Sequence, residues 1–113
     1  MSFFQSDVVR AEMAEISELQ EEIYGNVFKF PSMSSADKKY HVDILERLLD
    51  KQRVMYTRLS LSDDPDAKKM KEQIIESASM MGFPKNSDIN KMWDDMNKMV
   101  KIMKQQIDKE SES

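Results

Sequence analysis

The chain has few residues that could perform chemistry. His41 is the single histidine, there is no cysteine, and two glycines cannot form a Gly-rich phosphate loop. Acid–base and nucleophilic catalysis both need a positioned base. His41 lies among charged residues near the start of a predicted helix, which favours a surface or half-buried histidine. The sequence therefore predicts a non-enzymatic protein without catalytic, cofactor-binding or metal-binding residues.

Three acids crowd around Pro65, and metal binding is the chemistry to weigh for them. An EF-hand loop needs a glycine and a terminal glutamate at fixed spacing, which Asp63, Asp64 and Asp66 lack. A helix start explains them better. Asp64 suits an N-cap, Pro65 suits the first helical position, and Asp66 adds negative charge to the first turn. The cluster predicts a helix-to-helix joint.

Apolar residues recur at helical spacing along most of the chain. They predict one all-α domain over residues 1–113, with four main helices in antiparallel hairpins (a small helical bundle) and no sheet. Gly25 is the predicted end of the first helix, and the apolar connection 25–34 is expected to pack over the core. A homodimer through the second or fourth helix is the alternative arrangement. The predicted helices cover about 6–24, 35–59, 65–81 and 88–107, followed by a frayed polar tail, 108–113.

Methionines line one face of the predicted fourth helix: Met92, Met96, Met99 and Met103. Such a stripe is either core or an adaptable partner-binding surface, and its helical spacing favours core. Trp93 lies beside the stripe and is equally compatible with core and interface.

The net charge of −4 is unevenly distributed. Residues 1–24 hold six acids and one base, whereas residues 25–58 hold seven bases and four acids. The acids Glu15, Glu18 and Glu22 are candidate partner-binding residues, although a solvated face or pairing with the second helix explains them too. The bases could contact RNA phosphates, but a net acidic chain makes RNA binding unlikely. They are Lys38, Lys39, Arg47, Lys51 and Arg53.

Four blocks of sequence carry a family resemblance: FFQSDVV (3–9), LQEEIYGN (19–26), LLDKQRVMYTRLSLSDDPDA (48–67) and MGFP (81–84). The chain resembles a small helical family of cyanobacteria and cyanophages long classified as a domain of unknown function, most closely its phage-borne branch. The cellular members look like RNase E inhibitors. The resemblance implies a protein that binds the catalytic region of RNase E in the host-cell cytoplasm.

A cytoplasmic location also agrees with the absence of cysteine, of a long apolar run and of a signal-peptide pattern. The residues just before the helix-to-helix joint are further candidates for partner contact: Tyr56, Arg58, Leu59 and Leu61. A structural or assembly component of a phage particle is the alternative function. In that case Phe3, Phe4 and the methionine stripe would be packing surfaces.

Overall fold

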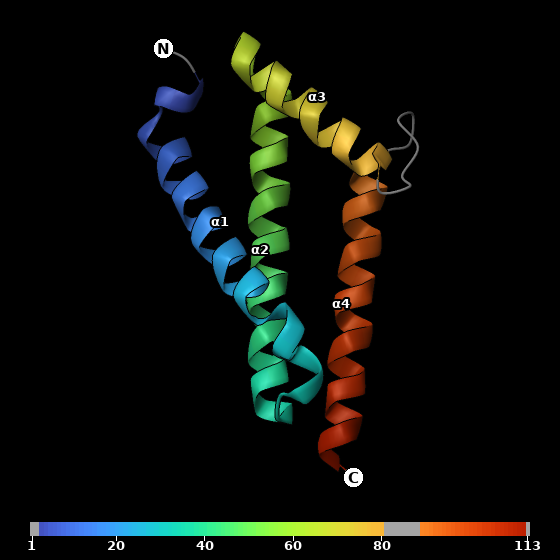
Figure 1. The fold of residues 1–113 in the computed structure, drawn as a ribbon. Helices are drawn as coiled ribbons and strands as arrows, with labels where there is room; N and C mark the ends of the chain where they lie inside the picture. Colours follow the sequence, from blue (N-terminus) through green and yellow to red (C-terminus); the bar gives the residue numbers. More distant parts are fainter. Residues whose placement is uncertain (1–2, 81–88, 113) are drawn as a thin grey trace.

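The computed structural model describes residues 3–80 and 89–112, and this part of the chain is almost entirely helical (Figure 1). It contains four α-helices, two short 3₁₀-helices and no strand, which confirms the predicted all-α fold. The elements are η1 (Phe3–Gln5), α1 (Asp7–Asn26), η2 (Val27–Ser32), α2 (Ser35–Leu61), α3 (Pro65–Met80) and α4 (Ile89–Glu112).

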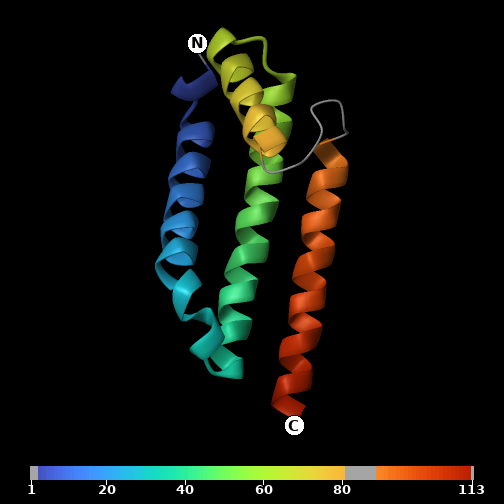
Figure 2. The same ribbon diagram turned by 45° about the vertical axis from the view of Figure 1, so that its right-hand side comes forward.

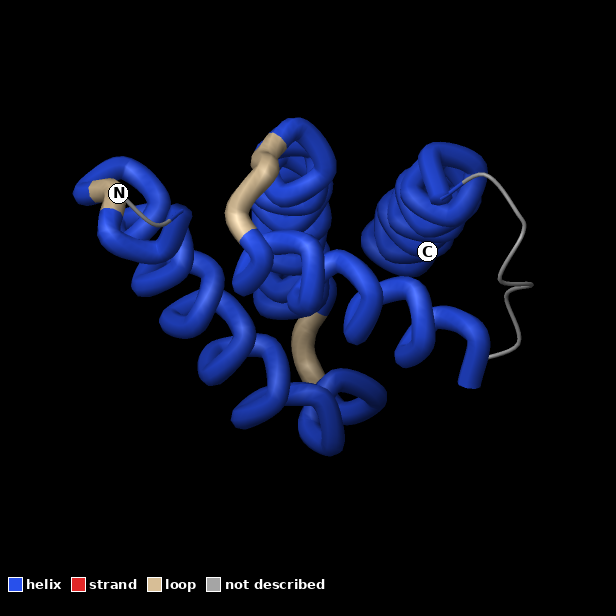
Figure 3. The backbone as a smooth tube through the Cα atoms, turned by 90° about the horizontal axis from the view of Figure 1, so that it is seen from above, coloured by secondary structure: helices blue, strands red, loops and turns tan. Residues whose placement is uncertain are grey.

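The three long helices lie side by side with α2 in the middle. Both α1 and α4 run antiparallel to α2, one on each side of it, and α3 crosses the end where α2 finishes (Figures 1 and 2). The view from above shows the same order (Figure 3). The molecule measures 54 × 31 × 19 Å, so the helices form an open layer, flatter than a closed bundle.

The helix α1 ends later than predicted. Gly25 stays within the helix, so its predicted role as a stop is wrong. Asn26 instead terminates α1, and its side-chain amide donates a hydrogen bond of 2.8 Å to the backbone carbonyl of Glu22. The Asn26 side chain thus bonds back to the preceding turn of the helix. The helix α2 likewise extends two residues beyond its predicted end, to Leu61.

The predicted frayed tail is also wrong over its described part, because α4 continues to Glu112. Two ion pairs tie this last segment to the first turns of α2. Lys38 contacts Glu110 at 3.1 Å, and Lys39 contacts Asp108 at 2.8 Å. Contacts with α2 thus hold residues that have no apolar pattern of their own.

The apolar connection is only partly buried. Phe30 packs against the core cluster of α2 and α4, as expected. Val27 and Phe28 are exposed, so the prediction that the whole connection covers the core is wrong. The connection forms the 3₁₀-helix η2, which turns these two side chains outward.

Local capping places the starts of α2 and α3. The Ser34 hydroxyl accepts a hydrogen bond of 3.2 Å from the Asp37 backbone N–H. Asp64 accepts one of 2.8 Å from the Asp66 backbone N–H, which confirms its predicted role as N-cap. The second carboxylate oxygen of Asp64 accepts from the backbone N–H of Phe3. Asp64 therefore joins the start of α3 to the N-terminal segment.

We expect this contact to make folding sensitive to acid. Hydrogen bonds from Phe3 first and Asp66 second hold the pKa of the Asp64 carboxyl below its usual value. A lowered folded-state pKa means that the stabilisation is complete above the unfolded pKa of about 4 and is lost as the pH falls through the folded pKa. The variant Asp64→Asn keeps a capping oxygen without the charge. Its melting temperature should lie below that of the wild type near pH 6, and the difference should close below about pH 4. A constant difference across this range would contradict the role of the charge.

The core consists of neighbouring clusters along α2. Leu19, Ile23 and Leu48 join α1 to α2, and Val42, Val100 and Ile107 join α2 to α4. The third cluster contains Val9, Met55, Leu59 and Ala67, and the fourth contains Tyr56, Met92 and Trp93.

The residues of α4 that face the core are spaced alternately three and four positions apart, as is typical of a coiled-coil seam. They are Trp93, Met96, Val100, Met103 and Ile107. Met92, Met96 and Met103 pack in the core, as the spacing favoured. Met99 is exposed, because the seam uses its neighbour Val100 at this level. Trp93 is a core residue.

Candidate functional site

Glu15 pairs within the molecule. Its carboxylate contacts Lys51 at 2.9 Å and Arg47 at 3.2 Å, both on α2. The hydrogen bond from Lys51, followed by the positive charges of Lys51 and Arg47, lowers the pKa of the Glu15 carboxyl. Glu15 therefore pairs with the second helix. This pairing was one of the two alternatives to a partner-binding role.

Glu18 and Glu22 have different surroundings. Glu22 is half-buried and accepts a hydrogen bond from the Tyr40 phenol, which raises the pKa of Tyr40. Glu18 is exposed. Two of the three predicted acids thus interact with α2, and the three do not present one continuous acidic surface.

The residues at the end of α2 also separate into two groups. Tyr56 and Leu59 are buried, so their side chains belong to the core and present no exposed surface to a partner. Arg58 is exposed and pairs with Glu12 of α1 at 3.1 Å. Leu61 is 81% exposed. Of the four predicted residues, Arg58 and Leu61 are therefore the exposed ones.

The five candidate RNA-binding bases are each paired with a carboxylate on a neighbouring helix. The pairs are Lys38–Glu110, Lys39–Asp108, Arg47–Glu15, Lys51–Glu15 and Arg53–Asp94. A phosphate backbone would have to compete with these carboxylates, so the geometry does not favour nucleic-acid binding.

An exposed apolar surface lies at the opposite end of α2 from Leu61. Phe28 is 95% exposed and Tyr24 67% exposed, and Val27 is exposed between them. These three residues, here called the η2 patch, lie within five successive positions, in the last turn of α1 and at the start of η2. Sequence reasoning noticed the apolar connection but assigned it to the core. The preference of aromatic side chains for interfaces was the signal that could have identified it.

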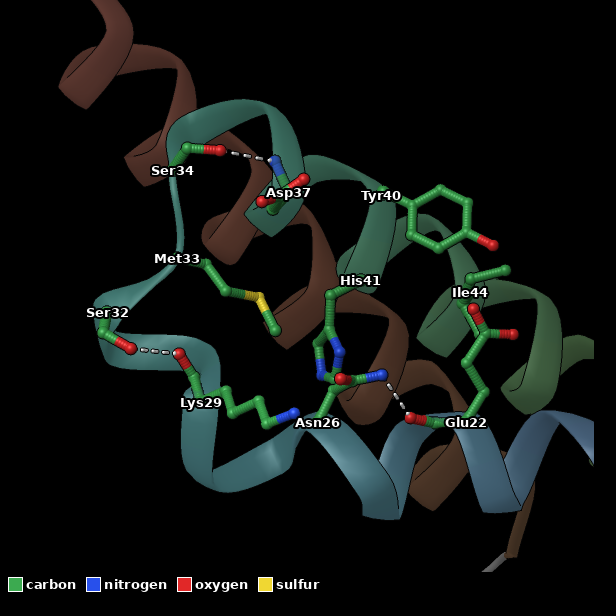
Figure 4. A pocket seen from close by; sticks show the side chains of 10 residues that line it. All are labelled: Glu22, Asn26, Lys29, Ser32, Met33, Ser34, Asp37, Tyr40, His41 and Ile44. Carbon is green, nitrogen blue, oxygen red and sulfur yellow. Dashed lines mark hydrogen bonds between the residues drawn. The ribbon is translucent and has the colours of Figure 1, made fainter.

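Beside η2 lies a pocket of about 490 Å³, formed by the end of α1, by η2 and by the first turns of α2 (Figure 4). Its lining combines acids, a base, hydroxyls and apolar groups: Glu22, Asn26, Lys29, Ser32, Met33, Ser34, Asp37, Tyr40, His41 and Ile44. The pocket therefore offers both charged and apolar contacts.

His41 forms the inner wall of this pocket and is only 8% exposed, so the prediction of a surface or half-buried histidine is wrong. Phe30 covers it, with 5.2 Å between the ring centroids. Within the described residues, no hydrogen bond reaches its imidazole nitrogens. No serine or carboxylate there orients His41 as a general base.

A second cavity, of about 420 Å³, lies beneath α3 and is mostly apolar. Met13 and Ile16 of α1, Met70 and Ile74 of α3, and Trp93 of α4 contribute to its walls. The indole N–H of Trp93 is buried and has no hydrogen-bond partner among the described residues.

Neither metal ligation nor membrane insertion has a counterpart in the described structure. Within residues 3–80 and 89–112, no group of three or more histidine or acidic side chains is placed to hold a metal ion. No helix over the same residues is both long and apolar enough to cross a membrane.

The chain matches one family model. No curated protein and no solved structure matches the chain. Residues 1–107 match the family described as a domain of unknown function, DUF1825. The match includes η1, α1, η2, α2 and α3, and α4 up to Ile107. The chain therefore belongs to the DUF1825 family.

Proposed function

We propose that this chain is a non-enzymatic protein-binding module that binds the catalytic region of RNase E and inhibits RNA cleavage. RNase E is proposed as the partner because of the family resemblance carried by the sequence blocks 3–9, 19–26, 48–67 and 81–84. The inhibitor would act by occupying a surface of the nuclease, since its own chain offers no positioned general base among the described residues.

The observation that supports a protein partner most directly is the η2 patch. A phenylalanine that is 95% exposed contributes almost nothing to the fold, and exposing its ring to water is unfavourable. Neighbouring exposed aromatic side chains are typical of the anchors that dominate binding energy at protein interfaces. We infer that Phe28 inserts into an apolar pocket of the nuclease and that Tyr24 and Val27 surround it.

The substitution Phe28→Asp tests this proposal. It should weaken binding to the catalytic region of RNase E roughly 30-fold or more, equivalent to a hot-spot loss of about 2 kcal/mol. Purified proteins, a labelled RNA and size-exclusion chromatography provide the measurements: the rate of cleavage and co-elution. The melting temperature should stay unchanged, because the Phe28 side chain lies outside the core.

Leu61→Asp is the matched control, an equally polar change at an exposed apolar residue, the last residue of α2. If Leu61→Asp abolishes inhibition and Phe28→Asp does not, the interface lies at the joint between α2 and α3. If wild-type protein in excess neither co-elutes with RNase E nor slows cleavage, the proposed function is wrong.

A further inference from the structure

The pocket beside η2 has features that the proposed inhibition does not require. His41 is more than nine-tenths buried, and its ring lies at the inner wall of the cavity between Met33 and Asn26 (Figure 4). Among the described residues the imidazole has a ring contact with Phe30. Its nitrogens are not among the fully buried polar atoms without a partner, so they have access to the cavity, where a ligand can bond to them.

The charges around the cavity indicate the sign of that ligand. Two carboxylates, Glu22 and Asp37, line the pocket against a single ammonium group, that of Lys29. The lining is therefore acidic on balance. Lys29 is exposed, so its flexible side chain can turn to solvent when a cation enters.

The hydrogen-bond acceptors that line the pocket outnumber the N–H donors of an ammonium group. Asn26 uses its amide N–H₂ on the backbone carbonyl of Glu22, which leaves its side-chain oxygen as an acceptor. This oxygen adds to the oxygens of the two carboxylates. A guanidinium group carries five donors in one plane, pairs with carboxylates through two parallel bonds and stacks on rings such as that of Tyr40.

We propose that this pocket binds a guanidinium group, held by Glu22 and Asp37 and stacked against Tyr40, with His41 accepting one of its N–H groups. The cavity of about 490 Å³ has room for the group and its aliphatic chain. The group belongs either to a small free molecule or to an arginine side chain of a protein partner. The second source rests on the proposed function, because the pocket adjoins the η2 patch.

Agmatine is the probe for the free ligand, and N-carbamoylputrescine, which replaces the guanidinium with a neutral urea, is its matched control. Titrations followed by nuclear magnetic resonance should show saturable shifts of the His41 ring signals with agmatine only. Asp37→Asn and Glu22→Gln should each weaken agmatine binding roughly tenfold, the loss expected for a charge-assisted hydrogen bond. Glu21→Gln, the same change on an exposed residue outside the pocket, should leave binding unchanged.

The same variants distinguish a partner's arginine from a free ligand. If agmatine does not bind but Asp37→Asn and Glu22→Gln weaken the RNase E complex, the group comes from the partner. Agmatine binding without any RNase E complex supports the pocket and rejects the proposed function. Equal binding of the guanidinium and urea probes overturns the guanidinium site. The guanidinium site is also overturned if agmatine does not bind and the two variants leave the RNase E complex unaffected. It is likewise overturned if agmatine does not bind and no complex forms.

Discussion

Replacing Leu59 with alanine should lower the free energy of unfolding by about 2–5 kcal/mol. Leu59 is 1% exposed and packs with Val9 of α1, Met55 of α2 and Ala67 of α3. Its removal would leave a cavity where three helices meet, and Ala67 is too small to fill it. Domains of this size are stable by only about 5–15 kcal/mol, so the loss is a large part of the total. Urea denaturation followed by circular dichroism measures it.

Leu61→Ala is the control for this experiment, because it makes the same change two residues further along α2. Its side chain is 81% exposed, so the expected effect is within about 0.5 kcal/mol. Similar losses for the two variants would mean that α3 does not pack against Leu59 as described.

Truncating Trp93 to alanine should have a comparably large effect, about 3–5 kcal/mol. Trp93 is buried between α2 and α4 in contact with Tyr56 and Met92, and Ile74 of α3 packs against the same cluster. Alanine would remove the largest side chain of that cluster. The melting temperature and the urea midpoint should fall together.

The substitution Trp93→Phe should lower the free energy of unfolding by much less than half of the loss expected for Trp93→Ala. The indole N–H is buried without a partner among the described residues, and such a donor destabilises a fold by about 1–3 kcal/mol. Phenylalanine keeps most of the apolar ring and removes the donor, so the two effects oppose each other. If urea denaturation shows that Trp93→Phe lowers the free energy of unfolding as much as Trp93→Ala, the indole N–H must have a hydrogen-bond partner in solution.

The local features of the fold were predictable from the sequence. Ser34 and Asp64 cap helices through bonds to residues two or three positions away, so their capping roles depend on nearby residues. The apolar spacing of α4 predicted a buried face for the same reason. Gly25 misled because a glycine ends a helix only where the backbone turns, and here the backbone stays helical to Asn26.

Features that depend on distant residues were not predictable. The last turns of α4 are held by Lys38 and Lys39, about 70 positions earlier in the chain. His41 has charged neighbours in sequence, yet Phe30 from η2 covers it. Burial of Tyr56 and Leu59 likewise depends on where α3 and α4 dock.

The candidate site was the least predictable part. An apolar connection in sequence is compatible both with a cover for the core and with an exposed anchor. Only the three-dimensional path of η2 separates Phe30, which packs inward, from Phe28, which is exposed.

The open layer has a consequence for how the molecule opens. Because α1 and α4 lie on opposite sides of α2, separate core clusters join each of them to α2. One cluster of α1 with α2 contains Leu19, Ile23 and Leu48, and one of α4 with α2 contains Val42, Val100 and Ile107. Either outer helix can therefore detach while the other keeps its packing on α2. Hydrogen exchange should then resolve two sub-global openings with separate free energies, and α2 should hold the most slowly exchanging amides.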